Sequence, residues 1–175
     1  MYKRQGDNDI GVDYIGIDDY DSSHMVVEHL VNQNCKRIAH IGGYRHTRIF
    51  KNRILGFIDA IQKHNLPYEE DLILEGSLTL QHGRDSMEQL LKLPNPPDAV
   101  YAASDYAALG ALQVMQEHDI KVPADIVLVG FSNEPFTSLV HPSISTVSQH
   151  SGEIGKIAAK TFLKRINEEN WIPKL

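Results

Sequence analysis

The feature that most constrains this sequence is the regular alternation of short β-rich runs with longer helical stripes. Short apolar runs of strand length stand at 12–17, 37–41, 72–74, 99–102, 126–129 and 144–147. Between them, apolar residues recur at helical spacing near 25–31, 49–64, 83–92, 105–117 and 154–168. Short connections between the two kinds of segment predict a doubly wound α/β fold with a parallel sheet. The near-continuous apolar run at 126–129 is typical of a strand covered on both faces.

Composition excludes several classes of protein. The chain has 175 residues, of which 42% are hydrophobic, so a globular domain with a real core is expected. One Cys excludes an internal disulfide framework and a Cys-rich zinc site. No apolar stretch is long enough to cross a bilayer, Met1–Asp7 has no apolar core of a signal peptide, and the expected location is the cytoplasm. The net charge of −6 argues against a DNA-binding surface within this chain.

The carboxyl ends of the predicted strands indicate where a ligand would bind, because ligands of parallel α/β sheets bind at that edge. These ends are readable as Ile17-Asp18-Asp19, Gly42-Gly43-Tyr44, Glu75-Gly76-Ser77, Ser104-Asp105 and Phe131-Ser132-Asn133. Four of the five contain a polar side chain followed by a turn or a helix cap. A polar binding site at this edge is therefore expected.

Motifs for catalysis or cofactor binding are weak or missing. There is no G-x-x-x-x-G-K-[ST] loop and no G-x-G-x-x-G, and Gly42-Gly43 is better explained as a turn than as a phosphate loop. Ser132 follows a strand, but it lacks the second glycine of a nucleophile elbow. The nine His residues show no metal-ligand spacing. No cofactor and no metal are expected.

Arg53 is the most informative single position. It lies four residues after Ile49 and four before Phe57, so the three share a helix face. A buried Arg needs a partner or a polar ligand; the alternative is an Arg at the edge of the face that reaches water. Ser104 and Asp105 have the same two interpretations, as ligand contacts or as caps of the helix that follows.

One helix has a face of small residues, made of Ala107, Ala108, Gly110 and Ala111. Small side chains let another element approach closely. That element is either another part of the same domain or a second subunit, and the sequence leaves both interpretations open.

Several motifs, in order, resemble the effector-binding region of the LacI/GalR family of bacterial transcriptional regulators. They are Glu28-His29-Leu30, Lys36–Gly43, Arg53–Phe57, Pro97–Val100 with Ser104-Asp105, Val122–Phe131 and Pro142–Gln149. The resemblance covers roughly 11–167. It implies a type I periplasmic-binding-protein-like fold of two α/β subdomains with a small effector, a sugar or sugar derivative, in the cleft between them. It also implies a homodimer that binds DNA only through a helix-turn-helix absent from this chain, and no contact with a membrane.

The resemblance also implies roles for individual residues. Arg53 matches an effector-binding arginine, and Asp105 matches an aspartate that follows a ligand-contacting Asn, here replaced by Ser104. Ser132 stands where the family often has a ligand-binding Asp, and Asn133 is the substitute. Leu78 stands where several members stack an aromatic ring, and Gln149 matches a Gln with a cleft contact. The expected dimer interface contains Ala108, Leu109, Leu112 and Phe136.

The resemblance divides the chain into parts. Residues 1–17 are expected to be the end of the N-terminal subdomain, 18–148 the C-terminal effector-binding subdomain, and 149–175 the return into the first. On this interpretation the chain is truncated, and residues 1–5 are foreign to the natural gene. The alternatives are a periplasmic sugar-binding protein of an uptake system and a serine hydrolase that uses Ser132.

Overall fold

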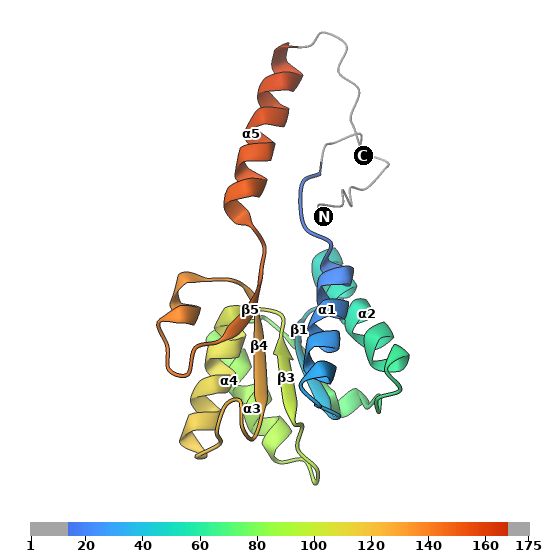
Figure 1. Cartoon of the computed structure of the whole chain (residues 1–175), viewed down its shortest axis with the longest axis vertical. Coiled ribbons are helices and arrows are strands. Elements are labelled where there is room, and N and C mark those ends of the chain that lie inside the picture. Colours follow the sequence, from blue (N-terminus) through green and yellow to red (C-terminus); the bar gives the residue numbers. More distant parts are fainter. Residues whose placement is uncertain (1–13, 168–175) are drawn as a thin grey trace. The chain divides into compact units, whose positions relative to one another are not determined.

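The computed structural model of the chain describes residues 14–167. In chain order, its elements are α1 (Asp19–Asn32), β1 (Ile38–Gly43), α2 (Arg48–Lys63), the 3₁₀ helix η1 (Glu70–Leu72), β2 (Ile73–Gly76), α3 (Leu80–Leu91), β3 (Ala99–Ala102), α4 (Asp105–Glu117), β4 (Val127–Ser132), the 3₁₀ helix η2 (Pro135–Ser138), β5 (Ser145–Ser148) and α5 (Ser151–Asn167). Strands and helices alternate as predicted (Figure 1).

The strands form one sheet in the order β2-β1-β3-β4-β5. β1 pairs in parallel with β2 and with β3, and β3 pairs in parallel with β4. His40 stands at the centre of this register, opposite Ile73 on one side and Tyr101 on the other. The predicted doubly wound α/β fold with a parallel sheet is confirmed.

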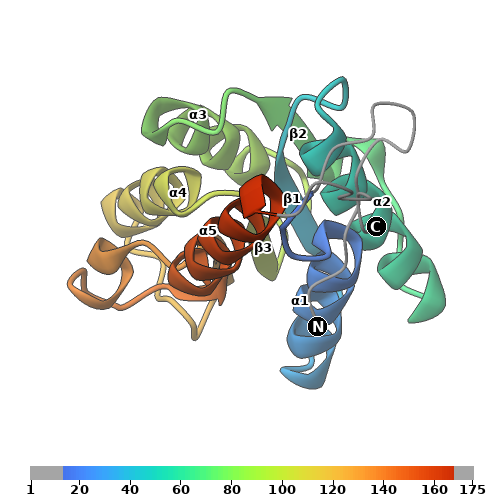
Figure 2. The same cartoon turned by 90° about the horizontal axis from the view of Figure 1, so that it is seen from above.

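Two helix layers cover the sheet. α1 and α2 lie on one face, and α3 and α4 lie on the other (Figures 1 and 2). Because side chains alternate along a strand, Ala39 and Ile41 of β1 pack in a core cluster with Met87 of α3. The ring of His40, between them in sequence, stacks on Phe57 of α2. Both faces of β1 are therefore buried, as the apolar pattern of parallel strands requires.

Helix α3 begins at Leu80, three residues before the expected start at Gly83. Thr79 is its N-cap, with a side-chain oxygen that accepts a hydrogen bond from the His82 amide at 3.1 Å. Gly83 lies inside the helix because α4 comes very close there: a Cβ on it would lie 2.0 Å from the Ala107 carbonyl oxygen. The small residues of α4 thus pack against α3 within the same domain.

The chain divides into two compact units. The central unit is Asp19–Val147, and the flanking unit is formed by the segments up to Asp18 and from Ser148 onward. Of the strand expected at 12–17, residues 14–17 are not in a strand, since they pair with no strand in the described part of the chain, and 12–13 lie outside it. No helix within residues 14–167 has the length and apolar character needed to span a membrane.

Candidate functional site

The carboxyl ends of the four parallel strands form one edge of the central unit. The strands end at Gly43, Gly76, Ala102 and Ser132. Parallel strands all end on the same edge, so the residues that follow them gather there. Five of the predicted ligand-binding residues stand at or just after these strand ends: Leu78, Ser104, Asp105, Ser132 and Asn133.

Arg53 reaches this edge from α2, and its side chain is buried, with 4% of the residue exposed. Its Nε and Nη2 atoms each lie 2.9 Å from Oδ1 of Asp19, and Nη1 donates to the carbonyl oxygen of Ala103 at 2.8 Å. A guanidinium has five N–H donors, and these contacts of the described residues use three. Arg53 is therefore a buried, paired arginine, and the alternative of an Arg reaching water is wrong.

Phe131, near the end of β4, packs its ring against the flat face of the Arg53 guanidinium. Cζ of Arg53 lies 3.5 Å from the centroid of the Phe131 ring, which is itself fully buried. A desolvated cation–π contact of this kind contributes about 2 kcal/mol. Together with Asp19 and Ala103, Phe131 fixes the orientation of Arg53.

Asp19 stands at one of the expected strand ends, but the sequence did not identify it as the partner of Arg53. It is the first residue of α1, where a carboxylate interacts favourably with the helix dipole, and only 6% of its side chain is exposed. The pattern around Arg53 indicated that a partner was needed. It did not indicate which one, because Asp19 stands 34 positions earlier.

Ser104 and Asp105 have structural partners at the start of α4. Ser104 is the N-cap, and its Oγ accepts from the Tyr106 amide at 3.2 Å. Asp105 is fully buried; its Oδ2 accepts from the Glu134 amide at 2.8 Å and its Oδ1 from the Thr146 hydroxyl at 2.6 Å. Both carboxylate oxygens of Asp105 therefore have partners within the central unit, and a direct ligand contact by this residue stays a prediction.

Leu78 is also largely internal. It packs in the core cluster under α3 and α4, with 8% of the residue exposed and a backbone φ of 56°. It offers at most a small apolar contact where the resemblance implies an aromatic ring.

Ser132 and Asn133 begin a tightly turned loop at the same edge. Their φ angles are 130° and 59°. Asn tolerates the left-handed region better than most residues, whereas Ser132 is strained there. Asn133 is exposed, and its backbone amide donates to Oγ1 of Thr146 at 3.2 Å. Asn133 is thus the predicted ligand residue of this loop that solvent reaches most freely.

A layer of buried rings adjoins Arg53. The ring centroids of Phe131 and Tyr101 are 6.5 Å apart, those of Tyr101 and His40 are 4.6 Å apart, and those of His40 and Phe57 are 5.0 Å apart. The hydroxyl of Tyr101 shares a hydrogen bond with Ser23 at 2.8 Å, and burial raises the pKa of Tyr101 to about 12. Both polar members of the layer, His40 and Tyr101, were missed from sequence, because their runs resemble ordinary apolar strands.

His40 is held neutral in this layer. Its Nδ1 lies 3.1 Å from the carbonyl oxygen of Tyr101, so Nδ1 carries the proton, since a carbonyl only accepts. Nε2 is then an acceptor, and it is buried without a partner among the described residues. Burial is the main reason that the pKa of His40 falls from 6.5 to about 3, and neighbouring Arg53 lowers it further.

The chain matches one family of known proteins over most of its length. Residues 27–174 match the family described as periplasmic binding protein-like domains. The chain belongs to the periplasmic-binding-protein-like family.

The relatives of this periplasmic-binding-protein-like chain are LacI-type regulators, as the motifs indicated. The transcriptional repressor CytR of Escherichia coli strain K12 is 32% identical over 156 residues, which are 89% of this chain and 46% of CytR. A structure assigned as a LacI regulator from Bacillus cereus subsp. cytotoxis NVH 391-98 has a TM-score of 0.85 at 28% identity, with 90% of this chain and 56% of that one covered. The complex of the regulator CelR with cellobiose has a TM-score of 0.82 at 28% identity, with coverages of 89% and 48%. The chain therefore spans about half the length of the relatives it matches.

The predicted interface residues of this periplasmic-binding-protein-like chain are only partly on its surface. Ala108 and Leu112 are 0% and 2% exposed, because the small face of α4 packs inside the central unit. Their place in an interface with a second subunit stays a prediction. Leu109 and Phe136 are half-buried, and Phe136 contacts the exposed ring of Tyr106 at a centroid distance of 5.1 Å.

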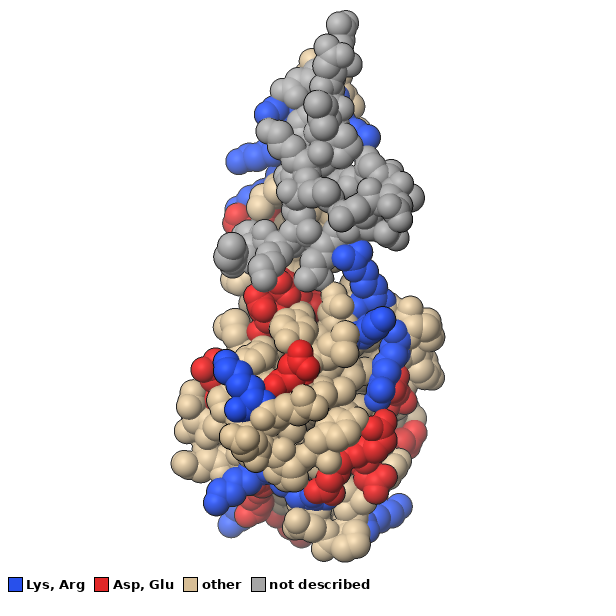
Figure 3. Space-filling view, turned by 90° about the vertical axis from the view of Figure 1, so that its right-hand side faces the viewer, with Lys and Arg blue, Asp and Glu red and all other residues tan. Residues whose placement is uncertain are grey.

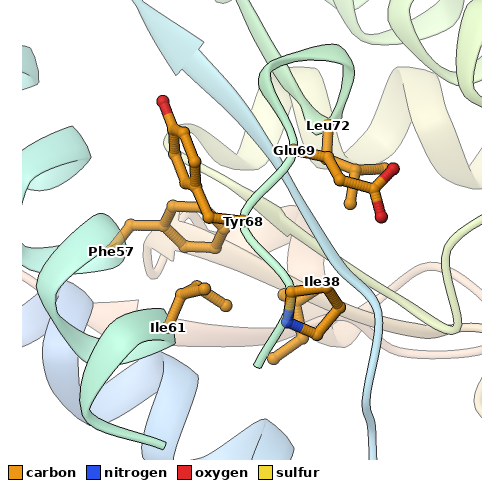
Figure 4. A pocket seen from close by; sticks show the side chains of 7 residues that line it. Ile38, Phe57, Ile61, Tyr68, Glu69 and Leu72 are labelled. Carbon is orange, nitrogen blue, oxygen red and sulfur yellow. The ribbon is translucent and has the colours of Figure 1, made fainter. Parts of the chain in front are cut away.

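Two further features lie away from the edge. A shallow, mainly apolar hollow lies beside Ile38, the first residue of β1, and thus at the opposite end of that strand (Figure 4). It is lined by Ile38, Phe57, Ile61, Pro67, Tyr68, Glu69 and Leu72, and has no interior room for a water molecule. Gln149 belongs to the flanking unit, and its role stays a prediction.

Charges on the face that carries α1 and α2 are mixed. Acidic and basic side chains alternate with uncharged ones over the part of this face that the structure describes (Figure 3). On α2, exposed Arg48 and Lys51 are followed by exposed Asp59, and α1 exposes Glu28. DNA-binding surfaces carry clustered basic residues. This described face is therefore not such a surface.

Proposed function

We propose that this chain is the effector-sensing part of a LacI-type transcriptional repressor and that it catalyses no reaction. The observation that carries the proposal is the oriented, buried Arg53 at the carboxyl edge of the sheet. Among the described residues, its partners use three N–H donors and leave two for a ligand. A preformed pair of donors binds neighbouring oxygens of a small molecule with little ordering cost.

The proposed effector is a sugar or sugar derivative. CelR, a structural relative, was solved with cellobiose. The two remaining N–H groups of Arg53 suit hydroxyl or carboxylate oxygens. Asn133 is exposed, and its side-chain amide can both donate and accept a hydrogen bond. Ser132, where the resemblance implies a carboxylate, leaves the acceptor role to Asn133.

Effector binding is proposed to change the affinity of the protein for its operator. A ligand shifts such an equilibrium only by binding one conformation more tightly than the other. The proposed protein acts in the cytoplasm as a homodimer and contacts DNA through a helix-turn-helix outside this chain.

The two alternatives receive less support. A periplasmic uptake protein has the same domain type, but the names of the relatives are those of repressors. A hydrolase that uses Ser132 lacks the usual geometry: the short 3₁₀ helix η2 follows the loop, whereas a nucleophile elbow leads into an α-helix. The gene sequence upstream separates the first alternative, since it encodes either a helix-turn-helix or a signal peptide.

The function is tested by screening the intact protein against sugars, phosphosugars and nucleobases in a thermal-shift assay. A true effector binds the native state, so it raises the unfolding midpoint, and the rise grows with the logarithm of its concentration once that concentration exceeds Kd. We expect at least one sugar-like compound to do so and to change operator affinity measured by fluorescence anisotropy. A midpoint shift that never alters operator affinity would contradict the regulator and support the uptake protein.

We also propose that the dimer forms through an apolar surface at η2, made of Tyr106, Leu109, Phe136 and Leu139. Leu139 is 81% exposed and Tyr106 is 51% exposed. Phe136 connects them, because its ring contacts Tyr106 and its carbonyl oxygen accepts from the Leu139 amide. Leu139→Asp should weaken self-association in sedimentation equilibrium by about tenfold or more. Leu55→Asp, at a 42% exposed site on α2, is the matched control and should leave the dimer intact. A monomeric wild-type protein would contradict this surface.

A further inference from the structure

The loop that carries Ser132 and Asn133 is held by a cluster of polar contacts inside the central unit. Glu134, the next residue, donates its amide to Oδ2 of Asp105 at 2.8 Å. The other carboxylate oxygen of Asp105 accepts from the Thr146 hydroxyl at 2.6 Å. Asp105 therefore joins the loop after β4 to the strand β5.

The hydroxyl group of Thr146 makes two hydrogen bonds. It donates to Oδ1 of Asp105, and its oxygen accepts from the backbone amide of Asn133 at 3.2 Å. Two successive loop amides, those of Asn133 and Glu134, thus end on this one cluster. These two acceptors hold the loop in its left-handed backbone conformation, with one hydrogen bond to each of the two successive backbone amides.

Gly130 makes the arrangement possible. A Cβ at this position would lie 2.2 Å from Oδ1 of Asp105, so only glycine lets the carboxylate sit against the end of β4. The helix dipole at the start of α4 favours the negative charge of Asp105 at that place.

We infer that Asp105 and Thr146 are positioning residues: they hold the Ser132–Asn133 loop ready for the effector and tie it to β5. This inference rests on the proposed function, in which that loop contacts the effector. Thr146 stands two residues before Ser148, where the flanking unit begins. The cluster thus connects the effector loop to the strand through which the chain leaves the central unit.

Hydrogen exchange measured by NMR on the ligand-free 175-residue chain tests the inference. The wild-type amides of Asn133 and Glu134 should exchange much more slowly than that of exposed Ser143. Thr146→Val keeps the shape of the side chain and removes the hydroxyl, so exchange at Asn133 should rise by about tenfold or more. Thr146→Ser restores the hydroxyl and should restore the protection.

Two controls separate positioning from general destabilisation. Ser145→Ala removes the exposed neighbouring hydroxyl of the same strand and should change neither amide. The amide of Val129, inside β4, should keep its rate in Thr146→Val, and equal acceleration at Val129 and Asn133 would overturn the inference.

Asp105→Asn is a second perturbation, needed if Thr146→Val does not fold. It should accelerate Glu134 more than Asn133, because only Glu134 donates directly to residue 105. Unprotected Asn133 and Glu134 in the wild-type chain would also overturn the inference. A failed search for an effector leaves these rates unchanged, so the two failures are distinguishable.

Discussion

The pair of Asp19 and Arg53 shows why a buried charge must be judged with its partner. Both side chains are almost fully buried, so removal of one leaves the other as an uncompensated charge. Arg53→Met should therefore cost about 3–5 kcal/mol in urea unfolding. The double variant Arg53→Met/Asp19→Asn should recover part of this loss. If the losses of unfolding free energy in Arg53→Met and in Asp19→Asn add up to the loss in the double variant, the two side chains are not energetically coupled, which would contradict the ion pair.

His40 makes stability depend on pH. Its pKa is about 3 in the folded protein and 6.5 ordinarily, so between these values the unfolded chain binds a proton that the folded chain does not. Stability from this residue is complete above pH 6.5 and should be lost as pH falls toward 3, by about 1.4 kcal/mol per pH unit. Urea unfolding at pH 4 to 7 measures this slope.

His40→Phe should flatten this pH dependence, because phenylalanine keeps the stacking and cannot bind a proton. His29→Gln, at an exposed position of α1, is the control and should keep the wild-type slope. An unchanged slope in His40→Phe would show that the proton binds elsewhere. His82, whose pKa is also lowered by burial, accounts for part of any slope that remains.

At the scale of elements, the contact of α3 with α4 depends on two glycines. A Cβ on Gly83 would lie 2.0 Å from the Ala107 carbonyl oxygen, and a Cβ on Gly110 would lie 2.0 Å from that of Leu80. Gly83→Ala and Gly110→Ala should each lower the free energy of unfolding by about 2 kcal/mol or more, because backbone atoms must move apart.

Gly155 provides the matched control for these substitutions. It also lies in a helix, α5, and a Cβ there meets nothing within 4 Å. Gly155→Ala should raise helix stability by about 0.5–1 kcal/mol. Equal effects at all three glycines, in either direction, would show that helix propensity rather than close packing decides the outcome.

The elements also show where sequence reasoning works. The order of strands and helices follows from local periodicity, which is why the α/β fold was predictable. The start of α3 was not, because Gly83 resembles a helix boundary when the approach of α4 is unknown. Asp105 accepts hydrogen bonds from Glu134 and Thr146, which lie 29 and 41 positions away. A local sequence pattern does not predict such contacts, because they form only when the strands assemble.

At the scale of the whole molecule, the fold determines the orientation of Arg53. Three neighbours from separate segments hold it: Asp19 from α1, Ala103 after β3, and Phe131 at the end of β4. The sheet topology brings these segments to one edge of the sheet, and exposed Asn133 follows β4 at the same edge. We propose that the guanidinium group of Arg53 binds the effector.

The most direct test is calorimetric titration of the intact protein with the effector found by the screen, in wild-type and Arg53→Lys forms. Lysine keeps the charge that Asp19 requires but loses the planar fork. We predict that effector affinity falls by about tenfold or more, while operator binding is retained. Arg84→Lys, on the surface of α3, should bind as the wild type does. An unchanged effector affinity in Arg53→Lys would contradict the role of Arg53.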